Sequence, residues 1–90
     1  MPLDIQPELP PLRNDPDGSV RVGDTRVLLV LVVEAYQDGA TPEEIVLGYP
    51  DLDLADVYGV IAYYLRRKPA VEAVLAEYHR AGDELRAKIE

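Results

Sequence analysis

Cysteine, tryptophan and phenylalanine are absent from this 90-residue chain, and histidine and serine occur once each, as His79 and Ser19. Without cysteine there is no disulfide, no thiolate chemistry and no zinc–cysteine site. The single histidine and serine leave few groups for nucleophilic or acid–base catalysis. We therefore expect a protein that is not an enzyme and has no cofactor, no metal site and no small-molecule substrate.

Long hydrophobic runs are also missing. The longest, Val27–Val33, has seven residues, whereas a membrane-spanning helix needs roughly 18. The N-terminus, Met1–Asp4, lacks the basic and apolar regions of a signal peptide. These features predict one small cytoplasmic domain with no membrane contact.

Positive charge is scarce, because nine Lys and Arg residues face seventeen Asp and Glu residues, for a net charge of −8. Residues 1–65 hold three Arg and twelve acids, a balance of 3 − 12 = −9, whereas residues 66–90 are close to neutral. Such a chain repels nucleic acid at long range and attracts a basic protein partner. The alternative is that the charge only keeps a small protein soluble.

The N-terminal part of the chain is rich in proline. Four of the eight prolines lie in residues 1–11, which predicts a flexible, extended arm. Asp15–Gly18 then separates two short runs, Leu12–Asn14 and Val20–Val22. Because proline and glycine favour tight turns, this pattern predicts a β-hairpin with both valines on one face and Arg21 on the other.

A helix is expected next, from Val27 to Asp38, with Gly39 as its stop signal. Its first two turns are apolar all round. Since a domain this small has little material to cover both sides, we expect a partner chain to cover the surplus.

Two further helices have clear start signals. Thr41 and Glu44 form a capping box before the second helix, and Asp53 caps the third. Gly59 in the third helix predicts a close helix crossing. The expected buried stripe of the third helix comprises Leu54, Val57, Ile61 and Leu65.

The C-terminal helix opens at Pro69 and carries a narrow apolar stripe suited to helix–helix contact. The prediction is therefore a mostly α fold: a winged helix-turn-helix-like helical core with a small N-terminal β-hairpin and a long C-terminal helix. The expected organisation is an arm over 1–11, a hairpin plus three helices over 12–68, and a C-terminal helix over 69–90.

Several motifs in order give the chain a family resemblance. They are Thr25–Val27, Gly39–Ile45, Tyr49–Leu52 and Ala62–Tyr64. The sequence resembles, over about residues 12–89, domain-of-unknown-function family 433 (DUF433), described as predicted antitoxin components of toxin–antitoxin systems. The resemblance implies a winged helix-turn-helix-like fold, a dimer and a toxin partner, often a PIN-like ribonuclease. Asp24 and Leu28 depart from the family pattern.

Two groups of residues are candidates for contact. Arginines are candidates for DNA or partner contact, although pairing with Asp15, Asp17 and Asp24 is an alternative for those in the hairpin region. The DNA-or-partner candidates are Arg13, Arg21, Arg26, Arg66 and Arg67. The dimer or partner interface candidates are Leu28, Leu29, Val32, Val71, Val74, Leu75, Tyr78 and Leu85.

The leading functional hypothesis is an antitoxin-like homodimer that masks a cognate toxin and binds DNA as a possible second activity. The acidic start of the third helix, with Asp51, Asp53 and Asp56, is poorly suited to the major groove. The alternatives are a stand-alone winged-helix DNA-binding regulator and a structural oligomerisation module.

Overall fold

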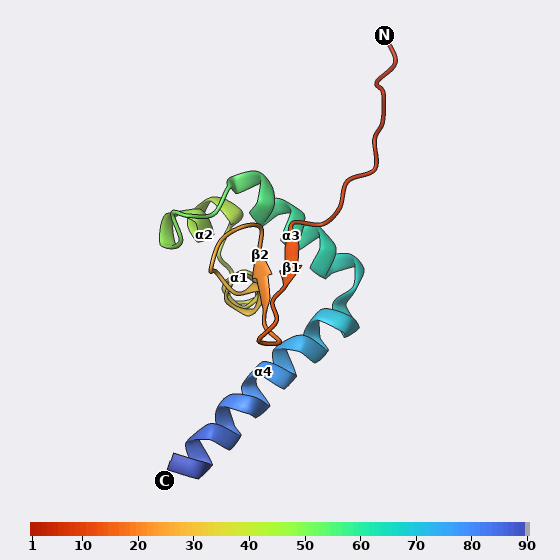
Figure 1. Ribbon diagram of the computed structural model, residues 1–90. Helices are drawn as coiled ribbons and strands as arrows, with labels where there is room; N and C mark the ends of the chain where they lie inside the picture. Colours follow the sequence, from red (N-terminus) through yellow and green to blue (C-terminus); the bar gives the residue numbers. More distant parts are fainter. Residues whose placement is uncertain (90) are drawn as a thin grey trace.

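The computed structural model describes residues 1–89, with side chains described up to Glu84. Figure 1 shows a small helical body, an extended N-terminal arm that leaves it on one side and a long helix that leaves it on the other. The predicted mostly helical fold, with a small N-terminal hairpin and a long C-terminal helix, is confirmed. In chain order the elements are β1 (Leu12–Asn14), β2 (Val20–Val22), α1 (Leu29–Gln37), α2 (Pro42–Gly48), α3 (Leu54–Arg66) and α4 (Lys68–Ile89).

The predicted hairpin is present with the expected boundaries. Strands β1 and β2 are antiparallel, with Leu12 opposite Val22 and Arg13 opposite Arg21. Gly18, at the end of the turn, has φ of +89°, a conformation that side chains with a Cβ rarely adopt. Val22 is fully buried, so the alternation places the valine face of β2 on the core.

Helix α1 begins two residues later than expected. Leu28 forms an isolated bridge with Arg21, and the Val27 carbonyl accepts a hydrogen bond from the Val22 amide. Val27 and Leu28 are therefore held beside β2 in extended form, and the helix starts at Leu29. The helix ends where predicted, and Gly39 has φ of +100°. The Gly39 amide donates to the Tyr36 carbonyl and the Ala40 amide donates to the Ala35 carbonyl, which is the pattern of a Schellman motif.

The expectation that α1 needs a partner chain for cover is wrong. Helix α1 packs against β2, α2, α3 and α4 of its own chain. Leu29 is 3% exposed and Val32 is fully buried, although both were expected at an interface between chains. Because helices and hairpin surround α1 on several sides, one copy of the chain is sufficient to bury most of this apolar run.

The start signals of α2 and α3 are confirmed. The Thr41 hydroxyl accepts from the Glu44 amide, and the Glu44 carboxylate accepts from the Thr41 amide, which completes the capping box. The Asp53 carboxylate accepts from the Ala55 amide at the start of α3. These caps satisfy backbone donors that a helix start otherwise leaves unpaired.

The predicted buried face of α3 is only half correct. Val57 and Ile61 are buried, but Leu54 and Leu65 are 40% and 48% exposed, and Val60 and Tyr64 take their places in the core. The buried face of α3 is therefore rotated from the predicted one. On it, Tyr64 reaches both neighbouring helices: its hydroxyl accepts from Gln37 of α1 and donates to Glu72 of α4.

Gly59 does permit a close contact, but its neighbour is the arm and not a helix. A Cβ at this position would lie 3.0 Å from the Pro11 Cδ atom. The Pro11 carbonyl also accepts from the Gly23 amide. The arm is therefore fixed at its last residue, Pro11, while its apolar side chains further out remain exposed.

Helix α4 starts at Lys68, one residue before the expected Pro69. Val71 and Leu75 are buried in the body, and His79 Nε2 lies 2.8 Å from a Glu34 carboxylate oxygen of α1. At 22 residues the helix is about 33 Å long, so it continues well beyond these contacts (Figure 1). No helix of residues 1–89 combines the length and hydrophobicity required to cross a membrane.

Candidate protein-binding groove

The hairpin arginines are used within the fold. Asp15 lies between them, 2.8 Å from Arg13 Nε and 2.6 Å from Arg21 Nε. Arg13 also donates to the carbonyls of Gly23 and Thr25. The hydrogen bonds from Arg13 and Arg21 hold the pKa of Asp15 below its ordinary value, and the bond to Asp15 raises the pKa of Arg13. Arg13 and Arg21 therefore follow the alternative interpretation, in which the hairpin arginines pair with neighbouring acids.

The other candidate arginines are exposed. Arg26 and Arg66 form no ion pair with any side chain described here, and Arg67 lies with its guanidinium 5.6 Å from the centre of the Tyr63 ring. Arg67 caps the C-terminus of α3, where a positive charge complements the helix dipole. The five candidate arginines thus form two sets: those of the hairpin strands are paired within the fold, and Arg26, Arg66 and Arg67 are exposed.

The predicted interface residues whose side chains are described also divide into two sets. Leu29, Val32, Val71 and Leu75 belong to the core of the chain itself, with at most 7% of each exposed. They are therefore not accessible to a partner in this conformation. The backbone of Leu85 lies in α4, and its side chain is outside the described residues. The three remaining candidates, Leu28, Val74 and Tyr78, line one groove.

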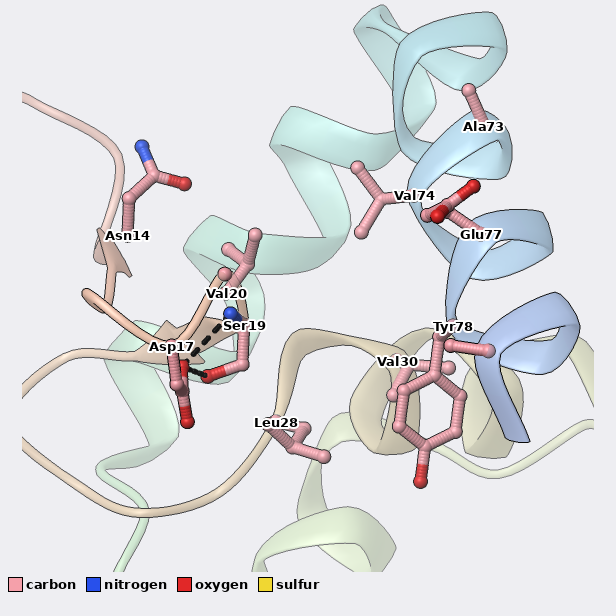
Figure 2. Close-up of a pocket in the computed structure, with 12 residues that line it drawn as sticks. Asn14, Asp17, Ser19, Val20, Leu28, Val30, Ala73, Val74, Glu77 and Tyr78 are labelled. Carbon is pink, nitrogen blue, oxygen red and sulfur yellow. Dashed lines mark hydrogen bonds between the residues drawn. The ribbon is translucent and has the colours of Figure 1, made fainter. Parts of the chain in front are cut away.

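This groove, which we call the hairpin–α4 groove, lies between the hairpin turn, the start of α1 and the middle of α4 (Figure 2). Its volume is about 680 Å³. Val74 and Tyr78 of α4 face Val20 and Leu28 across it, and Val74 and Tyr78 are 36% and 48% exposed. The complete lining is Asn14, Asp17, Gly18, Ser19, Val20, Leu28, Val30, Ala73, Val74, Glu77, Tyr78 and Ala81.

Acidic side chains lie at both edges of the groove. On the hairpin side, the Asp17 carboxylate accepts hydrogen bonds from the Ser19 hydroxyl and amide, which lower the pKa of Asp17. On the α4 side, a hydrogen bond from Arg80 lowers the pKa of Glu77. Both carboxylates are therefore charged at neutral pH, and each has an arginine partner outside the groove lining, Arg21 for Asp17 and Arg80 for Glu77. The lining itself thus carries acidic and no basic side chains.

One further pair of side chains with shifted pKa values lies outside the groove lining. Glu43 accepts a hydrogen bond from the Tyr58 hydroxyl, which lowers the pKa of Glu43 and raises that of Tyr58. Both shifts stabilise the ordinary protonation states. No group of three or more His, Cys, Asp or Glu side chains among the described residues is placed to hold a metal ion. An apolar groove of this kind is suited to binding a protein segment.

A second, smaller hollow of about 270 Å³ lies where α3 meets α4. We call it the elbow hollow. It is lined by Pro10, β1, Tyr63 and the first turns of α4, and it shares Asn14, Val20 and Val74 with the larger groove. Sequence reasoning missed the elbow hollow, because no local pattern indicates that β1 lies close to Ala70 and Val71.

The hairpin is followed by three helices joined by short turns, and the added C-terminal helix α4 forms one wall of the hairpin–α4 groove. The family model described as a protein of unknown function (DUF433) matches residues 17–64. The chain therefore belongs to the DUF433 family. The match is narrower than the resemblance over residues 12–89, so β1 and α4 lie outside it. No curated protein and no solved structure matched the chain.

Proposed function

We propose that this DUF433 protein is a non-enzymatic, antitoxin-like protein that binds and masks a basic partner toxin. The observation that carries the proposal is the hairpin–α4 groove, where half-exposed Val74 and Tyr78 lie above an apolar floor. Aromatic and aliphatic side chains of this kind are typical anchors of protein interfaces. The partner class comes from the family resemblance, which implies a toxin such as a PIN-like ribonuclease.

Charge supports a basic partner. The chain has a net charge of −8, and Asp17 and Glu77 add acidic edges to the groove itself. Ribonucleases bind a polyanion, so the entrance of their active site is expected to be basic. A basic helix or loop near that entrance would place its apolar side chains in the groove and its cations beside the acidic edges. Masking would then be steric and electrostatic.

The position of α4 also favours this proposal. The family model covers residues 17–64, from the hairpin turn to the last turn of α3, and α4 supplies the apolar wall of the groove. A helix outside the part of the chain that the family model matches is a simple way to give related proteins different partners.

Co-expression with the product of the adjacent gene tests the proposal. We expect a stable complex that inhibits the ribonuclease activity of the partner in a stoichiometric manner. Replacing Tyr78→Ala together with Val74→Asp should abolish the complex, because it removes one anchor and places a charge in the apolar wall that α4 supplies. Leu47→Ala is the control, since Leu47 of α2 is 81% exposed and lies outside the groove.

Two results would refute this function. One is the absence of any complex with adjacent gene products. The other is unchanged binding by the Tyr78→Ala/Val74→Asp variant, which would exclude the groove. In either experiment the folded state of each variant is checked by circular dichroism.

DNA binding is a second candidate, and the observation that favours it is the exposed side chain of Arg26, which forms no ion pair with the described residues. The acidic N-terminus of α3, with Asp53 and Asp56, argues against base reading by that helix. A salt-sensitive gel shift with the promoter of the chain's own gene, lost on Arg26→Ala, would support this function. Absence of any shift at low salt would exclude it.

A further inference from the structure

The N-terminal arm carries apolar side chains that the body of the chain does not cover. Leu3, Ile5 and Leu9 are 81%, 83% and 94% exposed. Between Pro2 and Pro7, apolar and polar residues alternate, so Leu3 and Ile5 lie on one side of an extended segment and Asp4 and Gln6 on the other. Such alternation is typical of a strand with one face buried.

The elbow hollow has the matching properties. Its lining includes Leu12, Tyr63, Ala70 and Val74, all of which are at least partly exposed. Among the described residues β1 pairs only with β2. On the second edge of β1 the Leu12 amide donates to the Pro10 carbonyl, and the Leu12 carbonyl and the backbone groups of Asn14 are available to an added extended segment.

Charge is complementary between the two surfaces. The arm holds Asp4 and Glu8 and no Lys or Arg. At the elbow, Arg66, Arg67 and Lys68 are exposed, and no ion pair joins them to any described side chain. Arg67 stacks on Tyr63, which lines the hollow. In a chain of net charge −8, this cluster is a favourable site for an acidic, apolar segment.

The arm is held away from the hollow of its own chain. The Leu12 amide donates to the Pro10 carbonyl at 2.8 Å, and the Gly23 amide donates to the Pro11 carbonyl at 2.9 Å. The Pro11 ring lies against Gly59. Proline fixes its own φ and keeps the preceding residue extended. These constraints direct residues 1–9 outward, away from α4 (Figure 1).

We propose that the arm of one copy occupies the elbow hollow of a second copy, with Leu3 and Ile5 against Tyr63, Ala70 and Val74. Pro10 lines the hollow and is also the residue where the arm leaves the body. A two-fold axis beside Pro10 therefore places each arm over the hollow of the other copy. Nine extended residues span about 30 Å, which is sufficient to cross the hollow. The exchange is symmetric and closed.

The first test is the association state of the full chain, measured by sedimentation equilibrium. We expect a dimer at micromolar concentration. Ile5→Asn should raise the dimer dissociation constant by about tenfold or more, and Lys68→Glu should also weaken the dimer. Gln6→Asn is the matched control, because Gln6 is on the opposite side of the arm, and it should leave the dimer unchanged. A monomeric wild-type chain, or a dimer equally stable with Ile5→Asn, would overturn the proposal.

The second test uses the absence of cysteine from the chain. A chain with Ile5→Cys is mixed with a chain with Ala70→Cys under mild oxidation. We expect a mixed disulfide dimer, and no such product when Leu47→Cys on α2 replaces Ala70→Cys. A chain that carries both Ile5→Cys and Ala70→Cys should give linked dimers. If it gives an intramolecular disulfide in monomers, the arm fills its own hollow and exchange between copies is wrong.

Discussion

Leu75 and Val74 are adjacent in α4 but have different surroundings, and their substitution separates folding from binding. Leu75 is 7% exposed and belongs to the core, whereas Val74 is 36% exposed in the hairpin–α4 groove. Truncation of a buried leucine to alanine costs about 2–5 kcal/mol. For a domain of this size, a loss of about 3 kcal/mol corresponds to a fall in Tm of about 12–24 °C.

Val74→Ala should have a much smaller effect on folding. The side chain is partly solvated already, and alanine has the higher helix propensity, so the free energy of unfolding should change by less than about 0.5 kcal/mol. Partner binding should weaken instead, because the groove loses an apolar contact. Leu75→Ala therefore reports on the docking of α4, and Val74→Ala reports on the two surfaces that Val74 lines, the hairpin–α4 groove and the elbow hollow.

The assay is urea unfolding followed by circular dichroism, with linear extrapolation of the free energy of unfolding. It is performed at two protein concentrations, because association of the folded chain would make the midpoint depend on concentration. Equal stabilities of Leu75→Ala and Val74→Ala would contradict the packing of α4 on the body. A larger loss of unfolding free energy from Val74→Ala than from Leu75→Ala would also contradict this packing.

Two further predictions concern the capping box and the hairpin. Thr41→Ala removes the acceptor for the Glu44 amide and should lower the free energy of unfolding by about 1 kcal/mol in the same urea assay; an unchanged midpoint would show that the cap contributes nothing. Arg13 and Arg21 lower the pKa of Asp15, so its contribution to stability is present above its unfolded pKa and is lost as the pH falls through the folded pKa. Thermal midpoints from neutral to acidic pH should therefore fall less steeply for Asp15→Asn than for the wild type, and parallel curves would contradict this role.

Local signals were sufficient to predict most elements. The turn at Asp15–Gly18, the caps at Thr41 and Asp53 and the stop at Gly39 each depend on backbone groups within a few residues. Their chemistry is therefore readable along the chain. The predicted start of α1 was wrong because Leu28 pairs with Arg21 of the preceding strand β2, so the helix begins after it.

The site was predictable only in part, because it depends on which surfaces meet. The apolar stripe of α4 was visible in the sequence, but spacing alone did not reveal that Leu75 packs inward while Tyr78 remains half-exposed. The same limit applies to Gly59, whose close neighbour is Pro11, 48 positions earlier in the chain. The use of Arg13 and Arg21 as internal cross-links likewise required knowledge of how the hairpin folds.

The interior has a consequence for how the sequence can vary. Among the side chains described up to Glu84, the largest that are fully shielded from water are all valines, on β2, α1 and α3: Val22, Val32, Val33, Val57 and Val60. Small branched groups let these elements approach closely, and a densely filled interior resists added volume. An isoleucine at one of these positions therefore requires a smaller residue at a facing one. In relatives with this backbone, a larger core residue on one of these three elements should be accompanied by a smaller residue on another, so that the total side-chain volume of the core stays nearly constant.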